Sequence, residues 1–132
     1  MYKYLMFFII FQALSCTDKG DPIMYSIKNS TNYNFKFVIF ERSGKIDTFP
    51  INILESKILS EDKPPYDAGP FGGFDSLKVV FEDSKTLTYI PFKSNSEWLD
   101  SVKNPFCPYS NYLCTENICT FEIDSIEYQK AK

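Results

Sequence analysis

The chain contains no histidine, and this absence excludes several kinds of active site. Histidine is the commonest general acid or base near neutral pH, a regular member of serine and cysteine catalytic triads, and a frequent zinc ligand. Without it, an enzyme would have to rely on carboxylates alone. We therefore expect a non-catalytic protein that uses no metal and no other cofactor.

An excess of positive charge and an apolar run of membrane-spanning length are also lacking. Lys and Arg number 14 against 17 Asp and Glu, so the net charge is −3, and no basic cluster favours nucleic-acid binding. The apolar run of residues 4–14 is shorter than the roughly 20 residues that a spanning helix needs. The sequence thus predicts no nucleic-acid partner, and residues 4–14 are too short to stay in a membrane as a span.

Residues 1–16 contain the three parts of a secretory signal. Lys3 supplies a positive charge, residues 4–14 are mostly apolar, and the small residue Ser15 stands directly before Cys16. A small residue followed by cysteine resembles the lipobox of bacterial lipoproteins. The resemblance implies that residues 1–15 are a signal peptide, that Cys16 carries acyl chains such as palmitate, and that these chains anchor the protein to a membrane.

Polar residues predict a flexible lipidated tether over residues 16–22. Its Asp18 and Asp21 resemble the surface-export signal of Bacteroidetes lipoproteins, although a plain solvated tether facing the periplasm has the same composition. The alternative to lipidation is an ordinary cleaved signal with an incidental cysteine. Ala13 and Leu14 leave this open, because the lipobox usually has Leu and then a small residue at these two places.

Residues 23–132 have the length and composition of one β-rich domain. Aromatic residues make up 17% of the chain, and together with Ile and Val they favour strands. The runs and turns indicate about seven or eight short strands, which predicts an all-β fold, either a single antiparallel β-sandwich or an open barrel. We expect residues 23–28 and 33–41 to form a hairpin with the second strand central, and residues 76–82 and 86–92 to form another hairpin.

Two segments of this domain are harder to interpret. Residues 46–53 read as a strand in which Pro50 must lie at an edge or a bulge, because proline cannot donate a ladder hydrogen bond. Residues 54–60 fit either a short strand or a loose helical turn. Residues 125–132 are expected to form a polar tail or a short helical turn.

Three cysteines lie in the C-terminal part of the chain. If Glu116 and Asn117 form a two-residue turn, Cys114 and Cys119 stand directly opposite each other on a hairpin and can form a disulfide. An extracytoplasmic compartment would permit that bond. Cys107 is then either free and buried, or it pairs with one of the other two instead.

Residues 61–75 form a long irregular stretch, rich in proline and glycine, that contains Tyr66, Phe71 and Phe74. One interpretation is an exposed aromatic ridge that grips a glycan or a protein partner. The other, which we favour, is that the rings fold back and plug one end of the sandwich. Trp98, the only tryptophan, is likewise expected to be a core plug rather than a ligand platform.

Several motifs extend the resemblance beyond the lipobox. The Asn-Ser-Thr turn at residues 29–31, the junction Gly-Pro-Phe-Gly-Gly-Phe-Asp-Ser-Leu at residues 69–77 and the closing aromatic and acidic strand resemble small Bacteroidetes lipoproteins with a β-rich domain of unknown function. Asp followed by Ser and an aliphatic residue also resembles the O-glycosylation acceptor pattern of that phylum. It occurs at Ser76, Ser101 and Ser125.

These features predict a lipid-anchored protein of the bacterial outer membrane, on its periplasmic or surface face. We expect a binding or interaction module whose partner is an envelope protein or a glycan. The alternative is a structural subunit of an envelope complex that docks by an edge strand. A third hypothesis is a hydrolase that uses carboxylates near the loops, but the spacing of these carboxylates indicates no particular chemistry. They are Asp67, Asp75, Glu82 and Asp83.

Overall fold

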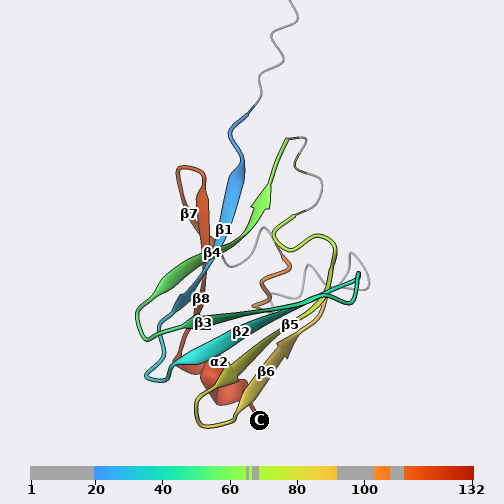
Figure 1. Ribbon diagram of the computed structural model, residues 1–132. Coiled ribbons are helices and arrows are strands. Elements are labelled where there is room, and N and C mark those ends of the chain that lie inside the picture. Colours follow the sequence, from blue (N-terminus) through green and yellow to red (C-terminus); the bar gives the residue numbers. More distant parts are fainter. Residues whose placement is uncertain (1–19, 65, 67–68, 92–102, 108–111) are drawn as a thin grey trace, which may run out of the picture.

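A computed structural model describes residues 20–64, 66, 69–91, 103–107 and 112–132 of the chain. The described residues form two four-stranded sheets that pack face to face, so the predicted β-sandwich is confirmed (Figure 1). In spatial order, sheet A consists of β4 (Ser56–Asp62), β1 (Ile23–Asn29), β8 (Ile118–Ile123) and β7 (Tyr112–Thr115). Sheet B consists of β3 (Ile46–Ile51), β2 (Phe35–Glu41), β5 (Phe74–Phe81) and β6 (Thr86–Tyr89).

The hairpin expected for residues 23–28 and 33–41 does not form, because β1 and β2 belong to different sheets. The turn between them is a corner built around Asn29, which is fully buried. Its amide nitrogen donates to the carbonyl oxygens of Tyr33 (2.8 Å) and Ile51 (3.2 Å), and its side-chain oxygen accepts from the backbone and hydroxyl of Thr31. These bonds satisfy a polar side chain inside the sandwich and direct the chain from one sheet to the other.

Other predicted elements are confirmed. β2 lies between β3 and β5, so it is central, and Pro50 sits on β3, an edge strand of sheet B. β5 and β6 form the expected antiparallel hairpin. All neighbouring strands are antiparallel except β1 and β8, which run parallel. Residues 56–62 form a strand, β4, which decides the ambiguity of residues 54–60.

The core lies between the sheets and is made of alternate residues of their facing sides. Sheet B contributes Phe37 and Val79, and sheet A contributes Ile27 and Phe121, all of them fully buried. Phe71, from the loop before β5, joins the same cluster. Alternation along β2 places Lys36 on the opposite, solvent-facing side.

The two ends of the sandwich differ in what surrounds them (Figure 1). At the end that we call the entry end, residues 20–22 lead into β1 beside the β7–β8 hairpin and the last residues of β4. The opposite end, which we call the far end, contains the β1–β2 corner, the β5–β6 turn and the short helix α2 (Ser125–Lys130). The helix decides between the polar tail and the short helical turn that were both expected after β8. No helix in the described ranges is long and apolar enough to cross a membrane.

Candidate functional site

The aromatic residues of the 61–75 loop lie at the entry end and do not form an exposed ridge. Phe71 is 1% exposed, and its ring lies 6.2 Å from the ring of Phe37, 5.9 Å from that of Phe74 and 6.2 Å from that of Phe106. Phe74 is half-buried against the same cluster. The interpretation in which these rings grip a ligand is therefore wrong for Phe71, which plugs the end of the sandwich.

Tyr66 is the exposed aromatic residue of this loop, at 40%. Its hydroxyl donates a 2.7 Å hydrogen bond to the carbonyl oxygen of Asp21, in the segment that leads into β1. Gly69 and Gly73 have positive φ angles of 70° and 89°, which allow the chain to reverse on both sides of Phe71. The described part of the loop therefore holds the incoming chain through Tyr66 and closes the core through Phe71.

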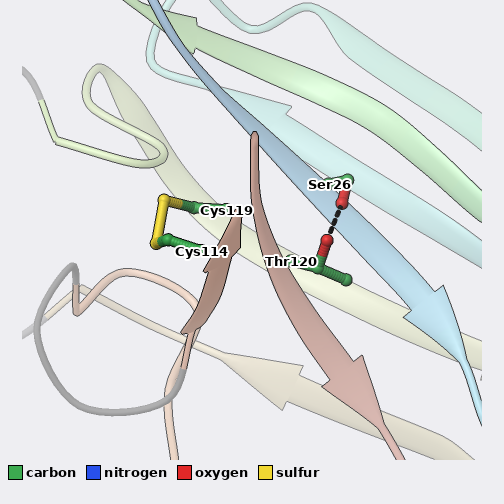
Figure 2. Close-up of a disulfide and its surroundings, with 4 residues drawn as sticks. All are labelled: Ser26, Cys114, Cys119 and Thr120. Atoms are coloured by element: carbon green, nitrogen blue, oxygen red, sulfur yellow. Dashed lines mark hydrogen bonds between the residues drawn. A yellow bond between two sulfur atoms is a disulfide. The ribbon is translucent and has the colours of Figure 1, made fainter. Parts of the chain in front are cut away.

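The β7–β8 hairpin carries the predicted disulfide. Cys114 and Cys119 are directly opposite in the register and their sulfur atoms are bonded (Figure 2). Cys107 is free and buried, which settles the alternative pairings in favour of the first one. At the tip, the Asn117 amide donates to the carbonyl oxygen of Pro22, and the Asn117 carbonyl accepts from Met24. The hairpin is thus fastened to the start of β1.

A surface hollow of about 300 Å³ lies at the far end, on the outer face of sheet B. Its floor includes Val80 and Pro50, which flank Lys36 in the cross-strand register. The remaining lining residues come from the ends of the same strands and the adjoining turns: Asn34, Phe35, Asn52, Phe81 and Glu82. The hollow is mainly apolar at its base and polar at its rim.

Asn34 holds the rim of the hollow together. Its amide nitrogen donates to Glu82 Oε2 (3.1 Å), its side-chain oxygen accepts from the backbone of Ile53 (3.0 Å), and its carbonyl accepts from Glu82. Within the described part of the chain, the Lys36 ammonium and the Asn52 side-chain amide have no partner. A cation, an amide and a partly used carboxylate therefore surround an apolar floor, which suits a ligand with both polar and apolar groups.

No pattern in the sequence indicated this hollow. Its residues belong to three segments that are separated along the chain, and each of them alone reads as the end of an ordinary strand. Only the pairing of β2 with both β3 and β5 brings them together.

Among the described carboxylates of the hydrolase hypothesis, Asp75 lies far from Glu82 and Asp83. Asp75 and Glu82 lie at opposite ends of the eight-residue strand β5, so roughly 20 Å of extended backbone separates them. Asp83 accepts a 2.5 Å hydrogen bond from the Tyr128 hydroxyl, which lowers the pKa of Asp83. Asp67 is outside the described residues.

A buried acidic residue at the far end is also fully engaged. Glu127 is 1% exposed and accepts hydrogen bonds from the Tyr89 hydroxyl (2.5 Å) and from Lys130 (2.6 Å). Burial, followed by the hydrogen bond to Glu127 and its charge, raises the pKa of Tyr89. Among the described residues, no group of three His, Cys, Asp or Glu side chains is placed to hold a metal ion.

The remaining predicted positions divide into two groups. Ser76 is half-buried on β5 opposite Phe40, and Ser125 is exposed at the first residue of α2, directly after the N-cap Asp124. Cys16, Trp98 and Ser101 lie outside the described residues. Of the predicted acceptor serines, Ser125 is thus the one whose position on the surface is shown.

Comparison with known proteins gave no match: neither a family model, nor a curated protein, nor a solved structure is significantly similar to this chain.

Proposed function

We propose that this protein is a lipid-anchored, non-catalytic binding module of the bacterial cell envelope, and that the far-end hollow contacts its partner. Residues 1–16 carry the lipobox-like signal that supports the anchor. The observation that supports the binding role is the place of the hollow at the end of the sandwich opposite the tether. An anchored domain would then present the hollow away from its own membrane.

The groups around the hollow favour an envelope protein segment or a glycan as the partner. Both offer apolar surface for Val80 and Pro50 together with hydrogen-bonding groups for Lys36, Asn52 and Glu82. The disulfide of the β7–β8 hairpin is compatible with the extracytoplasmic compartment that this proposal requires.

The anchor is tested by the intact mass of the protein extracted from membranes of its native host. The expected mass begins at Cys16 and includes acyl chains, and Cys16→Ala should leave the protein unacylated and without its anchor. A protein that begins at Met1, or one that has an unmodified thiol at residue 16, would refute the anchor.

The hollow is tested by placing a photo-crosslinking amino acid at residue 36 or, as a control, at residue 78. Both lysines lie on the outer face of sheet B, but Lys78 is not part of the hollow. Crosslinking in intact cells should be stronger from residue 36, and Lys36→Glu should weaken retention of the same partner while Lys78→Glu does not. Equal crosslinking from the two positions would contradict the binding role.

A structural subunit of an envelope complex is the second candidate, and an open sheet edge favours it. β4 is seven residues long, and no described strand pairs with its side away from β1. By contrast, the edge of β6 is occupied, because Thr86 exchanges two backbone hydrogen bonds with Lys132. This candidate predicts a complex of fixed stoichiometry in mild detergent, whereas a monomer would count against it.

A further inference from the structure

Four large apolar side chains lie close together on the outer face of sheet A at the entry end. Ile58, Leu113 and Ile118 are 51%, 74% and 40% exposed, and Met24 is half-buried. Met24 pairs with Ile118 across β1 and β8, and the next row of the sheet contains Ile58 and Leu113. We call these four residues the apolar face.

The polar groups in the middle of the apolar face are satisfied by each other. The Ser26 and Thr120 hydroxyl oxygens lie 2.7 Å apart in a hydrogen bond, and Ser26 is only 2% exposed. Figure 2 shows this pair on the opposite side of the sheet from the disulfide. Exposed polar residues, Glu61 and Thr115, flank Met24 and Ile118 in the same row, so the apolar face has a polar margin on each side. Between these margins its hydroxyls are already paired, and a partner that covers it needs no hydrogen-bonding groups of its own there.

The tether enters the molecule at this face. Met24 follows Pro22 by two residues, and both the Met24 amide and the Pro22 carbonyl are held by Asn117, next to Ile118. The chain from Cys16 to Met24 can extend at most roughly 25–30 Å, at about 3.3–3.6 Å per residue. An acylated Cys16 would therefore keep the apolar face close to the bilayer surface.

We propose that the apolar face lies against the interfacial region of the membrane that holds the anchor; this inference rests on the proposed lipid anchor. Four side chains are too few for a stable protein interface, which typically buries about 800 Å² on each partner. A tether makes the membrane contact intramolecular, so that a small apolar contact suffices. The sandwich would then be held in one orientation, with the hollow directed away from the lipid.

The charges around the apolar face indicate which lipid it contacts. Lys28 forms an ion pair with Glu122 and Lys63 forms one with Glu61, while Glu116 at the hairpin tip has no cationic partner among the described residues. The border is therefore acidic or neutral and does not attract an anionic surface. The contact is apolar in character and should form on zwitterionic phosphatidylcholine.

The test uses the full-length acylated protein in phosphatidylcholine vesicles that contain lipids brominated on their acyl chains. Leu113→Trp places a fluorescent reporter on the apolar face, and Ile46→Trp is the matched control, because Ile46 is 58% exposed on β3 of sheet B. The emission of Trp98 is subtracted with the parent protein. An interfacial side chain reaches ~5–10 Å into the headgroup and acyl boundary, so quenching of Leu113→Trp should exceed that of Ile46→Trp by about threefold or more.

The possible outcomes distinguish a failure of the proposed orientation from a failure of the proposed lipid anchor. If the protein floats with the vesicles but both reporters are quenched equally, the orientation is refuted and the anchor stands. If the protein does not float, the anchor is refuted, and the orientation with it. Quenching that changes with the density of protein in the membrane would identify a second copy of the chain as the occupant and would also refute the proposal.

An independent measurement avoids the reporter substitutions. Amide hydrogen exchange of residues 112–118 should slow when the acylated protein is in vesicles rather than in detergent micelles of short-chain lipid. The double variant Leu113→Ser with Ile118→Ser should still float, because its tether is intact, but should lose this protection. Protection that persists in the double variant would overturn the inference.

Discussion

At the entry end of the sandwich, aromatic rings and a disulfide close the core, whereas at the far end hydrogen-bonded polar side chains do so. Phe71 and the Cys114–Cys119 bond characterise the first, and Asn29 and the Glu127–Tyr89 pair characterise the second. Packing of rings is indifferent to pH, while a buried carboxylate must keep its partners. The two ends should therefore respond to different perturbations.

The outer surfaces of the two sheets also differ between the entry end and the far end. Near the entry end, sheet A presents Leu113 and Ile118 to solvent, and the hydroxyls between them are paired. Near the far end, sheet B presents Lys36, which has no partner among the residues that the structure describes, beside the apolar floor of the hollow. One end thus suits contact with lipid, and the other suits recognition of a partner that has polar groups.

The largest effect is expected from Phe71→Ala at the entry end. Removing a fully buried ring leaves a cavity, and such substitutions typically cost about 3–5 kcal/mol of unfolding free energy. The matched control is Tyr66→Ala, from the same loop but 40% exposed, which should cost less than about 1 kcal/mol. Urea denaturation measures both values, and equal losses would show that Phe71 is not the plug.

The disulfide should contribute less to the free energy of unfolding than the ring of Phe71 does. Cys114 and Cys119 are separated by five positions, and closing so short a loop in the unfolded chain stabilises by about 2 kcal/mol in the chain-entropy model. Cys114→Ser with Cys119→Ser should lower stability by that amount and remove any effect of reductant on the urea midpoint. Cys107→Ala, which removes a buried thiol outside the bond, should keep the reductant effect.

At the far end, Tyr89→Phe removes one partner of the buried Glu127 but leaves Lys130 in place. We expect a loss of about 1–2 kcal/mol at pH 7. Because the pKa of Tyr89 is raised above its ordinary value of 10.0, its stabilising contribution is complete below pH 10 and is lost as pH rises further. The variant should therefore lose less stability than the parent between neutral and strongly alkaline pH, measured by urea denaturation at each pH.

A pH dependence that is unchanged in Tyr89→Phe would show that the alkaline sensitivity comes from other groups. Tyr112 is the obvious comparison, because burial also raises its pKa and its hydroxyl donates to the Pro105 carbonyl at the entry end. Tyr112→Phe removes no donor from a carboxylate, whereas Tyr89→Phe removes the donor to Glu127 Oε2. Its cost at pH 7 should accordingly be the smaller of the two.

Local signals in the sequence predicted the elements that short-range geometry determines. The four residues between β5 and β6 and the two residues between β7 and β8 fix those hairpins and the cysteine pair. Pro50 predicted an edge strand or a bulge because it lacks the amide of a regular central strand, and β3 is an edge strand. In each case the deciding residues are neighbours in the chain.

Long-range contacts decided what the sequence did not predict. Asn29 reads as a turn residue of a hairpin, but its amide bonds to Ile51, a residue of the other sheet, so the chain crosses over instead. The parallel pairing of β1 with β8 joins residues that are 94 positions apart in the chain, as in the Ser26–Thr120 hydrogen bond. The irregular pattern of β4 arises from the bulge opposite Tyr25 and Ser26, which breaks the alternation that identifies a strand.

The smallest effect should come from the pair of Asp83 and Tyr128 on the surface of the far end. The hydrogen bond from the Tyr128 hydroxyl lowers the pKa of Asp83, so Tyr128→Phe should raise that pKa toward its ordinary value of 3.8. A lowered pKa in the folded state stabilises the fold at pH values above the unfolded-state pKa, and this stabilisation is lost as pH falls below that value. The variant lacks this contribution, so its stability should depend less on acid. Asp83 is fully exposed, and water screens the pair, so its contribution to stability at pH 7 should be too small to resolve. Carboxyl carbon chemical shifts followed by NMR as a function of pH measure the pKa directly. An unchanged pKa would mean that the Asp83–Tyr128 hydrogen bond forms only transiently and that the buried side chains, Asn29 and Glu127 among them, close the far end without it.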